Sequence, residues 1–170
     1  MRMKTVPKRR RRECKTDYLA RLKMLKGGRP RLVFRKTNRY LIVQYIKSEE
    51  AKDKVVFGVT SKFLLKKGWP EEFRGSLKSI PAAYLMGYYV AKKIKRDRLE
   101  NPILDVGMLR MIHKSRPYAF IKGLVDAGLD ISCKEEAFPE KERIEGKSLK
   151  LDFSGKFKEI KSKLEENGSD

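Results

Sequence analysis

Cysteine and histidine are scarce in this 170-residue chain, which contains Cys14, Cys133 and His113 and no other residue of either type. Two isolated cysteines provide no disulfide framework, and a structural zinc site needs about four ligands. The single histidine has no Ser–His or Cys–His arrangement around it that would support nucleophilic catalysis. We therefore expect no metal site, no cofactor and two free thiols, in a reducing cytoplasmic setting.

Long apolar runs are also missing. No segment approaches the roughly 20 consecutive apolar residues of a membrane span, and the basic N-terminus has no apolar stretch behind it to make a secretory signal. Gly27-Gly28 is not followed by the further glycine and Lys-Ser/Thr of a phosphate-binding loop. These absences predict a soluble intracellular protein with no membrane partner.

Positive charge is what the chain has in excess. It carries 42 Lys and Arg against 22 Asp and Glu, a formal charge of +20. Residues 1–40 contain 16 of the basic residues but only Glu13 and Asp17, a net charge of +14. Such an asymmetry indicates a basic arm on a nearly ordinary domain, with a polyanionic partner.

The segment Arg29 to Lys47 predicts a β-hairpin that turns at residues 36–39. Arg31, Val33 and Arg35 alternate with Leu32 and Phe34, as in a half-buried strand. We expect the two arginines to face outward, so that alanine there weakens binding of a polyanion and leaves the melting temperature nearly unchanged. Tyr40 and Tyr45, interleaved with the cations, fit either base stacking or ordinary strand packing.

The rest of the chain predicts an α/β order. A buried strand is expected at 54–59, a short helix near 62–67, and a long helix within 76–97 capped by Ser79 with Pro81 in its first turn. A strand at 103–106 and a helix over 116–127 follow. The predicted fold is a mixed sheet, an antiparallel three-strand meander plus a crossover strand, with packed helices.

Three regions follow from this pattern. Residues 1–28 form a basic arm and a short amphipathic helix, residues 29–131 an α/β core, and residues 132–170 a charged C-terminal extension. The extension is expected to be an irregular, extended tail on a partner surface, with a short helix over 154–166. Gly87 is expected to allow close packing of the long helix on the sheet.

The arm itself cannot fold in isolation, because Lys8 and Arg9–Arg12 repel one another and bring no apolar surface. The helix after it should be capped by Thr16, with Tyr18, Leu22 and Leu25 on one face. That face could bind a membrane in principle, but it is short and lacks Trp and Phe. Packing on the domain or on RNA is the interpretation we favour.

An enzyme of the metal-dependent nuclease type would need a carboxylate on the first strand, and residues 31–36 contain none. Asp105 and Asp126 are more typical of capping or surface positions than of metal ligands. DNA is not favoured as a partner, because no recognition-helix unit or zinc finger occurs. Arginine forks beside tyrosines instead suit a structured RNA with unpaired bases.

Several segments in colinear order resemble the 5S-rRNA-binding ribosomal proteins of the large subunit, the universal protein eighteen family in its archaeal and eukaryotic form. The resemblance covers roughly residues 6–150 and is carried by Val6–Tyr18, Arg21–Leu22, Arg29–Val33, Arg35–Asn38, Gln44, Phe120–Ile131, Phe138–Pro139 and Glu142–Gly146. Cys14 departs from the glycine or small residue expected there, which puts the local backbone shape in question.

The resemblance implies a structural protein of the cytoplasmic ribosome that binds 5S rRNA and helps attach it to 23S rRNA in the central protuberance, beside neighbouring ribosomal proteins. It also implies a ribonuclease-H-like topology without catalytic carboxylates. RNA contacts are carried over to Arg9, Arg10, Arg11, Arg12, Lys15, Thr16, Tyr18, Arg21, Arg31, Arg35, Lys36, Thr37, Asn38 and Arg39. The local charge adds Lys8 and Arg29, and its place among the hairpin cations adds Tyr40. The alternative function is an RNA-processing or ribosome-assembly factor on the same core.

Overall fold

The computed structural model describes residues 5–50, 52–147 and 152–166. Its core is a four-stranded sheet of order β3-β2-β1-β4, built from β1 (Arg31–Lys36), β2 (Leu41–Glu49), β3 (Lys52–Thr60) and β4 (Ile103–Asp105). β1 pairs antiparallel with β2 and parallel with β4, and β2 pairs antiparallel with β3. The predicted meander with a crossover strand is confirmed, and the wider ribonuclease-H-like topology stays a prediction.

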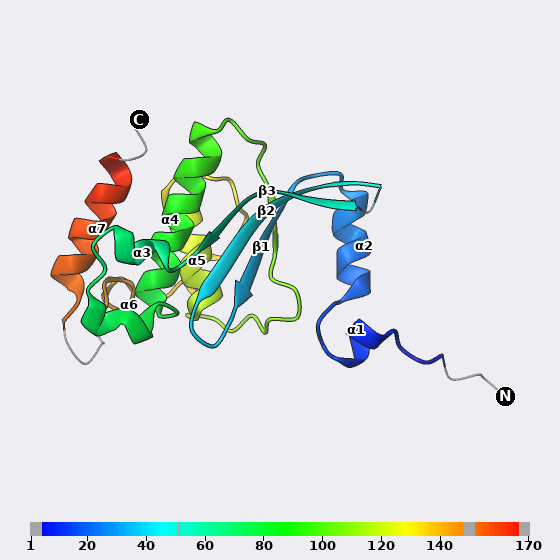
Figure 1. Cartoon of the computed structure of the whole chain (residues 1–170), viewed down its shortest axis with the longest axis horizontal. Coiled ribbons are helices and arrows are strands. Elements are labelled where there is room, and N and C mark those ends of the chain that lie inside the picture. The colour runs from blue at the N-terminus through cyan, green and yellow to red at the C-terminus, as the bar shows by residue number, and fades with distance from the viewer. Residues whose placement is uncertain (1–4, 51, 148–151, 167–170) are drawn as a thin grey trace.

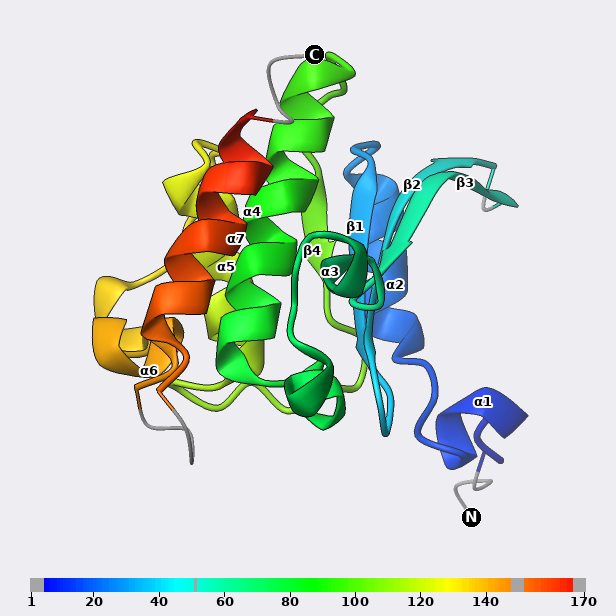
Figure 2. The same ribbon diagram turned by 60° about the vertical axis from the view of Figure 1, so that its left-hand side comes forward.

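Helices lie on both faces of this sheet (Figures 1 and 2). α4 (Ile80–Arg96) and α5 (Arg116–Asp126) cover one face, whereas α2 (Tyr18–Lys26) lies against the other, beyond the single turn of α1 (Arg9–Arg12). The alternation of β1 determines which side chains meet the helices: Leu32 and Phe34 are fully buried. Phe34 packs on Phe120 of α5 with ring centroids 4.7 Å apart.

The long helix α4 begins as its sequence predicts. The Ser79 hydroxyl accepts a hydrogen bond from the Ala82 amide, and Pro81 occupies the first turn, where its missing N–H costs nothing. Ala82, Leu85, Met86, Val90 and Ile94 are then buried at helical spacing. α4 therefore forms the centre of the molecule, between the sheet and the C-terminal helix (Figure 2).

The prediction that Gly87 packs closely on the sheet is wrong, because its close contact is with α5. A Cβ at Gly87 would lie 2.2 Å from the Phe120 carbonyl oxygen, and a Cβ at Gly123 would lie 2.2 Å from the Tyr84 carbonyl oxygen. Both distances are well inside van der Waals contact. The two glycines thus face each other's helix and allow the α4 and α5 backbones to touch.

The C-terminal segment differs from its prediction. Its described part is not an extended, irregular tail: α6 (Lys141–Glu145) and α7 (Ser154–Glu166) pack on the core. Phe153, Phe157, Ile160 and Leu164 are buried at helical spacing, so the predicted helix over 154–166 is confirmed. The burial of four large apolar side chains makes this helix part of the folded domain, and residues 148–151 and 167–170 lie outside the described residues.

The predicted strand at 54–59 is confirmed as part of β3, but its predicted burial is wrong. β3 is an edge strand whose Val55 and Val56 are 48% and 44% exposed, and a bulge opposite Ile46 leaves Val56 out of the pairing register. Such bulges are common at sheet edges. The chain then continues through α3 (Phe63–Lys66), the 3₁₀ turn Glu71–Ser76 and, after α5, the 3₁₀ turn Glu135–Ala137.

Replacing Gly87 with alanine should destabilise the fold by roughly 1–3 kcal/mol or more, because the new methyl group would overlap the α5 backbone. Thermal unfolding measures the effect. Gly155→Ala in α7 is the matched control: its Cβ would meet no atom within 4 Å, so its melting temperature should stay the same or rise slightly. Equal melting temperatures for the two variants would contradict the close contact.

Candidate nucleic-acid interface

The basic arm is held by local contacts. All four arginines of α1 are exposed, the Arg10 Nε donates to Thr16 Oγ1 over 2.9 Å, and the Lys15 ammonium lies 2.8 Å from Glu13. The Lys8 ammonium stands 4.9 Å above the Tyr18 ring. Surface contacts of this kind contribute about 0–1 kcal/mol each, so the arm can rearrange at little cost.

Cys14 adopts a backbone conformation that glycine would favour. Its φ is +51°, in the left-handed region, and it lies where the chain turns from α1 toward α2. An L-residue other than Asn or Asp rarely takes this conformation. Cys14, which replaces the glycine or small residue expected here, therefore lies at a tight turn, and its thiol is exposed.

Asp17, and not Thr16, caps α2. Its carboxylate accepts from the amides of Leu19 and Ala20 at 3.1 and 3.3 Å. Leu19 and Leu22 are 65% and 50% exposed, and Tyr18 is also exposed. Leu25, the third member of the predicted apolar face, is half-buried, so this face packs on the domain only near the end of the helix and is otherwise uncovered by the described part of the chain.

Arg31 is buried, which contradicts its predicted place as an outward-facing RNA contact. Its side chain is 2% exposed, and its guanidinium donates to Asp105 Oδ2 at 2.9 Å, Asp53 Oδ1 at 2.7 Å and Ser48 Oγ at 3.2 Å. The alternation of β1 is as predicted, but α2 and the β2–β3 hairpin cover this face. Arg31 is therefore a structural residue.

Arg35 lies on the same face but nearer its end, with 41% of its side chain exposed. Its guanidinium donates to the backbone oxygens of Phe34 and Asp105, both at 2.9 Å, and to Asp105 Oδ1 at 3.2 Å. Asp105 also accepts from the Gly107 amide at 2.8 Å and is buried. Asp105 is thus a buried acceptor that joins β1, β4 and the following loop, and not a capping or surface residue.

Asp53 links the sheet to α2. Partial burial opposes its ionisation, but hydrogen bonds from Ser48, Arg21 and Arg31 hold the pKa of its carboxyl below the usual value. The Arg21 guanidinium lies 2.9 Å from Asp53 Oδ2, and Arg31 occupies the other oxygen. α2 is therefore tied to the sheet through a shared carboxylate.

The hairpin turn is internally braced. The Thr37 hydroxyl donates to the Tyr40 carbonyl at 2.8 Å and accepts from its amide at 3.0 Å, while Lys78 reaches the Asn38 carbonyl. Tyr40 is half-buried below the Lys62 ammonium, 4.8 Å from its ring centre. Tyr45 is fully buried, stacks on Phe57 and donates to the Glu100 carbonyl, so of the two alternatives it takes strand packing.

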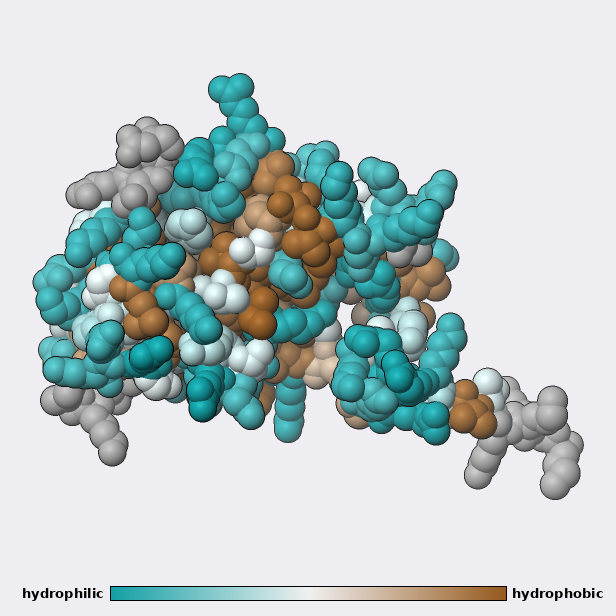
Figure 3. All heavy atoms as spheres, viewed as in Figure 1, coloured by the Kyte–Doolittle hydropathy of each residue, from teal (hydrophilic) through white to brown (hydrophobic). Residues whose placement is uncertain are grey.

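Several predicted cations remain unbalanced. Arg12, Arg29, Lys36 and Arg39 are exposed and form no ion pair among the described residues. They are spread along the chain from α1 past the end of α2 to the β1–β2 turn, and Lys36 also lines a pocket at the end of β1. Figure 3 shows hydrophilic side chains over much of α1 and α2.

Sequence reasoning missed the two carboxylates that organise this surface, Asp53 and Asp105. The sequence does contain a signal for Asp105: it is the single acidic residue in an otherwise apolar strand, and the crossover order places that strand in the same sheet as the arginines of β1. In residues 5–50, 52–147 and 152–166 no group of three or more His, Cys, Asp or Glu is arranged to hold a metal. Within the same ranges no helix has both the length and the apolar character to cross a bilayer.

Comparison with known proteins gives consistent matches. Residues 2–101 match the family described as ribosomal large subunit proteins 60S L5 and 50S L18. A large ribosomal subunit protein uL18 from Korarchaeum cryptofilum (strain OPF8) is 45% identical over 161 residues, which is 95% of this chain and 76% of the relative. Its counterpart of the same name from Thermofilum pendens (strain DSM 2475 / Hrk 5) is 39% identical over 144 residues, 85% of this chain and 71% of the relative.

Replacing Arg31 with alanine should destabilise the fold by about 3–5 kcal/mol, because the buried Asp105 would lose its principal counterion. Thermal or urea unfolding measures this. Arg29→Ala is the control: Arg29 lies two residues before Arg31, is exposed and forms no ion pair with the described residues, so its loss should leave the melting temperature within error. A wild-type melting temperature for Arg31→Ala would contradict the structural role of Arg31 and support the predicted role as an RNA contact.

Acid should loosen α2 before it unfolds the core. Because the folded pKa of Asp53 is lowered, its contribution to stability is complete above the unfolded pKa of about 3.9 and disappears as pH falls through the folded pKa. The protection factors of the amides of residues 18–26, measured from pH 6 to pH 2 and corrected for the intrinsic exchange rate at each pH, should fall over that window relative to those of α4. Asp53→Asn should remove the pH dependence of α2 protection. Identical pH profiles for the wild type and this variant would contradict the role of Asp53 in holding α2 to the sheet.

Proposed function

The chain belongs to the family of ribosomal large subunit proteins 60S L5 and 50S L18, and from this premise we propose that it binds 5S rRNA and helps attach it to 23S rRNA in the central protuberance. As a large-subunit ribosomal protein it acts in the cytoplasm as a structural part of the ribosome, and not as an enzyme. Its further partners would be the neighbouring proteins of that region.

One observation carries the proposal: the arm and hairpin keep exposed cations that no carboxylate in the described chain neutralises. Arg12, Arg29, Lys36 and Arg39 have no ion pair there, and Arg9 and Lys15 share Glu13. Such cations are solvated in the free protein. When they bind phosphates they release the counterions condensed there, and this release contributes favourable free energy to binding. The charge is thus arranged for a long polyanion.

The proposed RNA-contacting set differs from the predicted one at one position, since Arg31 is removed from it by burial. The remaining members lie on the arm, α2 and the turn: Lys8, Arg9, Arg10, Arg11, Arg12, Lys15, Thr16, Tyr18, Arg21, Arg29, Arg35, Lys36, Thr37, Asn38, Arg39 and Tyr40. Exposed Tyr18 offers a ring for an unpaired base, and exposed Leu19 and Leu22 offer apolar contact to the RNA.

Replacing Arg9, Arg10, Arg11 and Arg12 together with glutamine should weaken 5S rRNA binding and lower the magnitude of the log–log salt slope by up to about 3, as roughly four phosphate contacts are lost. Filter binding at several salt concentrations measures both quantities. The matched control replaces four exposed cations elsewhere, Lys66, Arg96, Lys156 and Lys158, with glutamine, and it should retain most of the affinity.

Specificity is tested with tRNA as the competitor. The wild-type protein should prefer 5S rRNA at physiological salt, and equal affinity for the two RNAs would refute the 5S assignment. Retention of the protein in large subunits washed at high salt would in turn separate a structural constituent from an assembly factor.

A further inference from the structure

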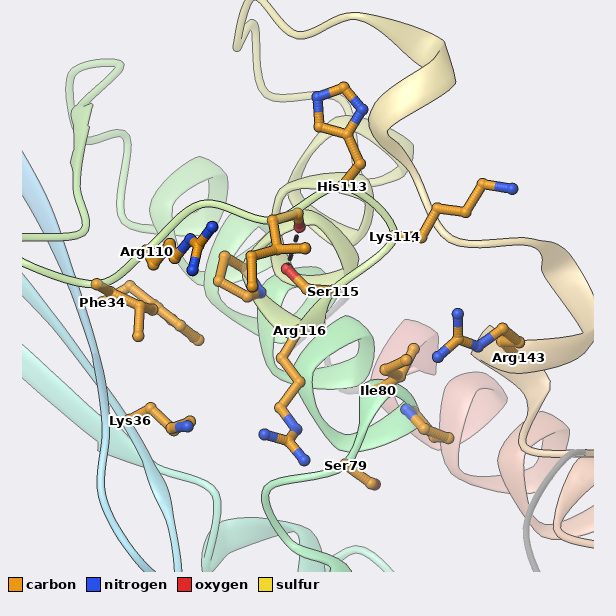
Figure 4. A pocket seen from close by; sticks show the side chains of 14 residues that line it. Phe34, Lys36, Ser79, Ile80, Arg110, His113, Lys114, Ser115, Arg116 and Arg143 are labelled. Carbon is orange, nitrogen blue, oxygen red and sulfur yellow. Dashed lines mark hydrogen bonds between the residues drawn. The ribbon is translucent and has the colours of Figure 1, made fainter.

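A basic groove lies away from the arm, where the end of β1 meets the N-terminal ends of α4 and α5 (Figure 4). It encloses about 550 Å³, and the loop before α5 forms one wall. Apolar side chains line much of it, among them Phe34, Ile80, Pro81, Leu109, Ile112 and Pro117. This apolar lining distinguishes the groove from the open surface of the arm.

Basic residues from four separate segments line the groove: Lys36, Arg110, Lys114, Arg116 and Arg143, together with His113. No aspartate or glutamate is among the lining residues. Lys114 pairs with Glu140 outside the groove at 2.8 Å, and Glu140 also attracts Arg143. Lys36, Arg110 and Arg116 form no ion pair in the part of the chain that the structure describes, so the groove holds uncompensated positive charge.

Folding alone gives no reason for this arrangement. Like charges brought together from distant parts of the chain repel one another and lower stability. A core-forming role would bury the cations or pair them, as Arg31 is paired, but Arg110 and Arg143 are exposed. The cluster is therefore best explained by a ligand that carries negative charge.

The shape of the groove indicates which kind of anion it takes. In Figure 4 the Arg116 guanidinium extends between Lys36 and Ser79, and Arg143 reaches toward the groove from the opposite wall. The Ser115 hydroxyl bonds to the Ile112 carbonyl and does not cap α5, so the positive end of this 11-residue helix adds to the field. Cations at the rim and apolar side chains inside match a nucleotide, whose phosphate carries charge and whose base is a flat apolar plate.

The groove is connected to the arm through one loop. Arg11 of α1 donates to the Met108 sulfur at 3.6 Å, and the next residues, Leu109 and Arg110, line the groove. We infer that the groove binds unpaired nucleotides of RNA as a second site, with Arg110, Arg116 and Lys36 on phosphates and the apolar lining against a base. The inference rests on the proposed function only in taking RNA as the polyanion.

An acidic peptide is the other anion that could enter. RNA is favoured because planar guanidinium groups pair with phosphate through two parallel hydrogen bonds, and because the apolar lining would remain uncovered by a run of carboxylates. A ribosomal protein is also surrounded by RNA.

The test uses the full-length protein with Arg110→Gln and Arg116→Gln and, as probes, a fluorescent ten-residue oligouridylate, a ten-base-pair RNA duplex and a ten-residue oligoglutamate. The variant should bind oligouridylate about tenfold more weakly or worse, because two charged phosphate contacts are lost. Arg96→Gln with Lys158→Gln, which removes the same charge from exposed sites on α4 and α7, should bind within about twofold of wild type. Arg110→Gln alone, in an exposed loop, provides the comparison if the double variant unfolds.

The position of binding is read from backbone amide NMR shifts. Oligouridylate should shift amides of residues 79–82 and 109–117 in the wild type, and in the double variant it should shift those of the arm alone. Unchanged affinity, shifts confined to the arm, stronger shifts with the duplex, or stronger shifts with oligoglutamate would each overturn the inference. Loss of 5S preference over tRNA with intact groove shifts would refute the proposed function and leave this site standing.

Discussion

The buried carboxylate of Asp105 is the interaction on which the sheet and its attachments depend. It accepts hydrogen bonds from Arg31, Arg35 and the Gly107 amide, and Arg31 also donates a hydrogen bond to Asp53. Burial of an ion pair costs several kcal/mol of desolvation per ion, which is offset only when geometry and hydrogen bonding are nearly complete. Here β4, β1 and the β2–β3 hairpin must all be in place before both charges are satisfied, and α2 joins the cluster through Arg21 on Asp53. The ion cluster therefore specifies their mutual arrangement more than it adds net stability.

This cluster divides the arginines of one strand into two roles. Arg31 and Arg35 share a face, yet Arg31 lies beneath α2 while Arg35 stays 41% exposed at the edge. An arginine whose donors are taken by buried carboxylates has little left to offer a phosphate. The positive field outside the protein comes instead from exposed cations such as Arg12, Arg29 and Arg39, which form no ion pair with another described residue. A count of arginines in the hairpin would overstate its capacity to bind RNA.

Elements whose pattern is contained within a short segment could be predicted from the sequence. Ser79 and Pro81 mark the start of α4, the alternation around Phe34 sets the faces of β1, and the spacing from Phe157 to Leu164 gives α7. Features that depend on distant segments could not. The burial of Arg31 requires Asp53 and Asp105, 22 and 74 residues away. The exposure of Val55 and Val56 depends on β3 being at the sheet edge, because an apolar run fits a central strand equally well.

The same limit applies to the interface. The arm is visible in the sequence because its cations are consecutive, whereas the groove cations come from β1, the loop before α5, α5 itself and α6, and they meet only in the fold. Both surfaces leave several of their charges unpaired within the described chain, which raises self-repulsion in a protein of formal charge +20. A polyanion that binds the folded state removes this repulsion and stabilises the fold by mass action. Charge that destabilises the free chain thus becomes a source of stability once RNA is bound, and this coupling explains why the molecule keeps it.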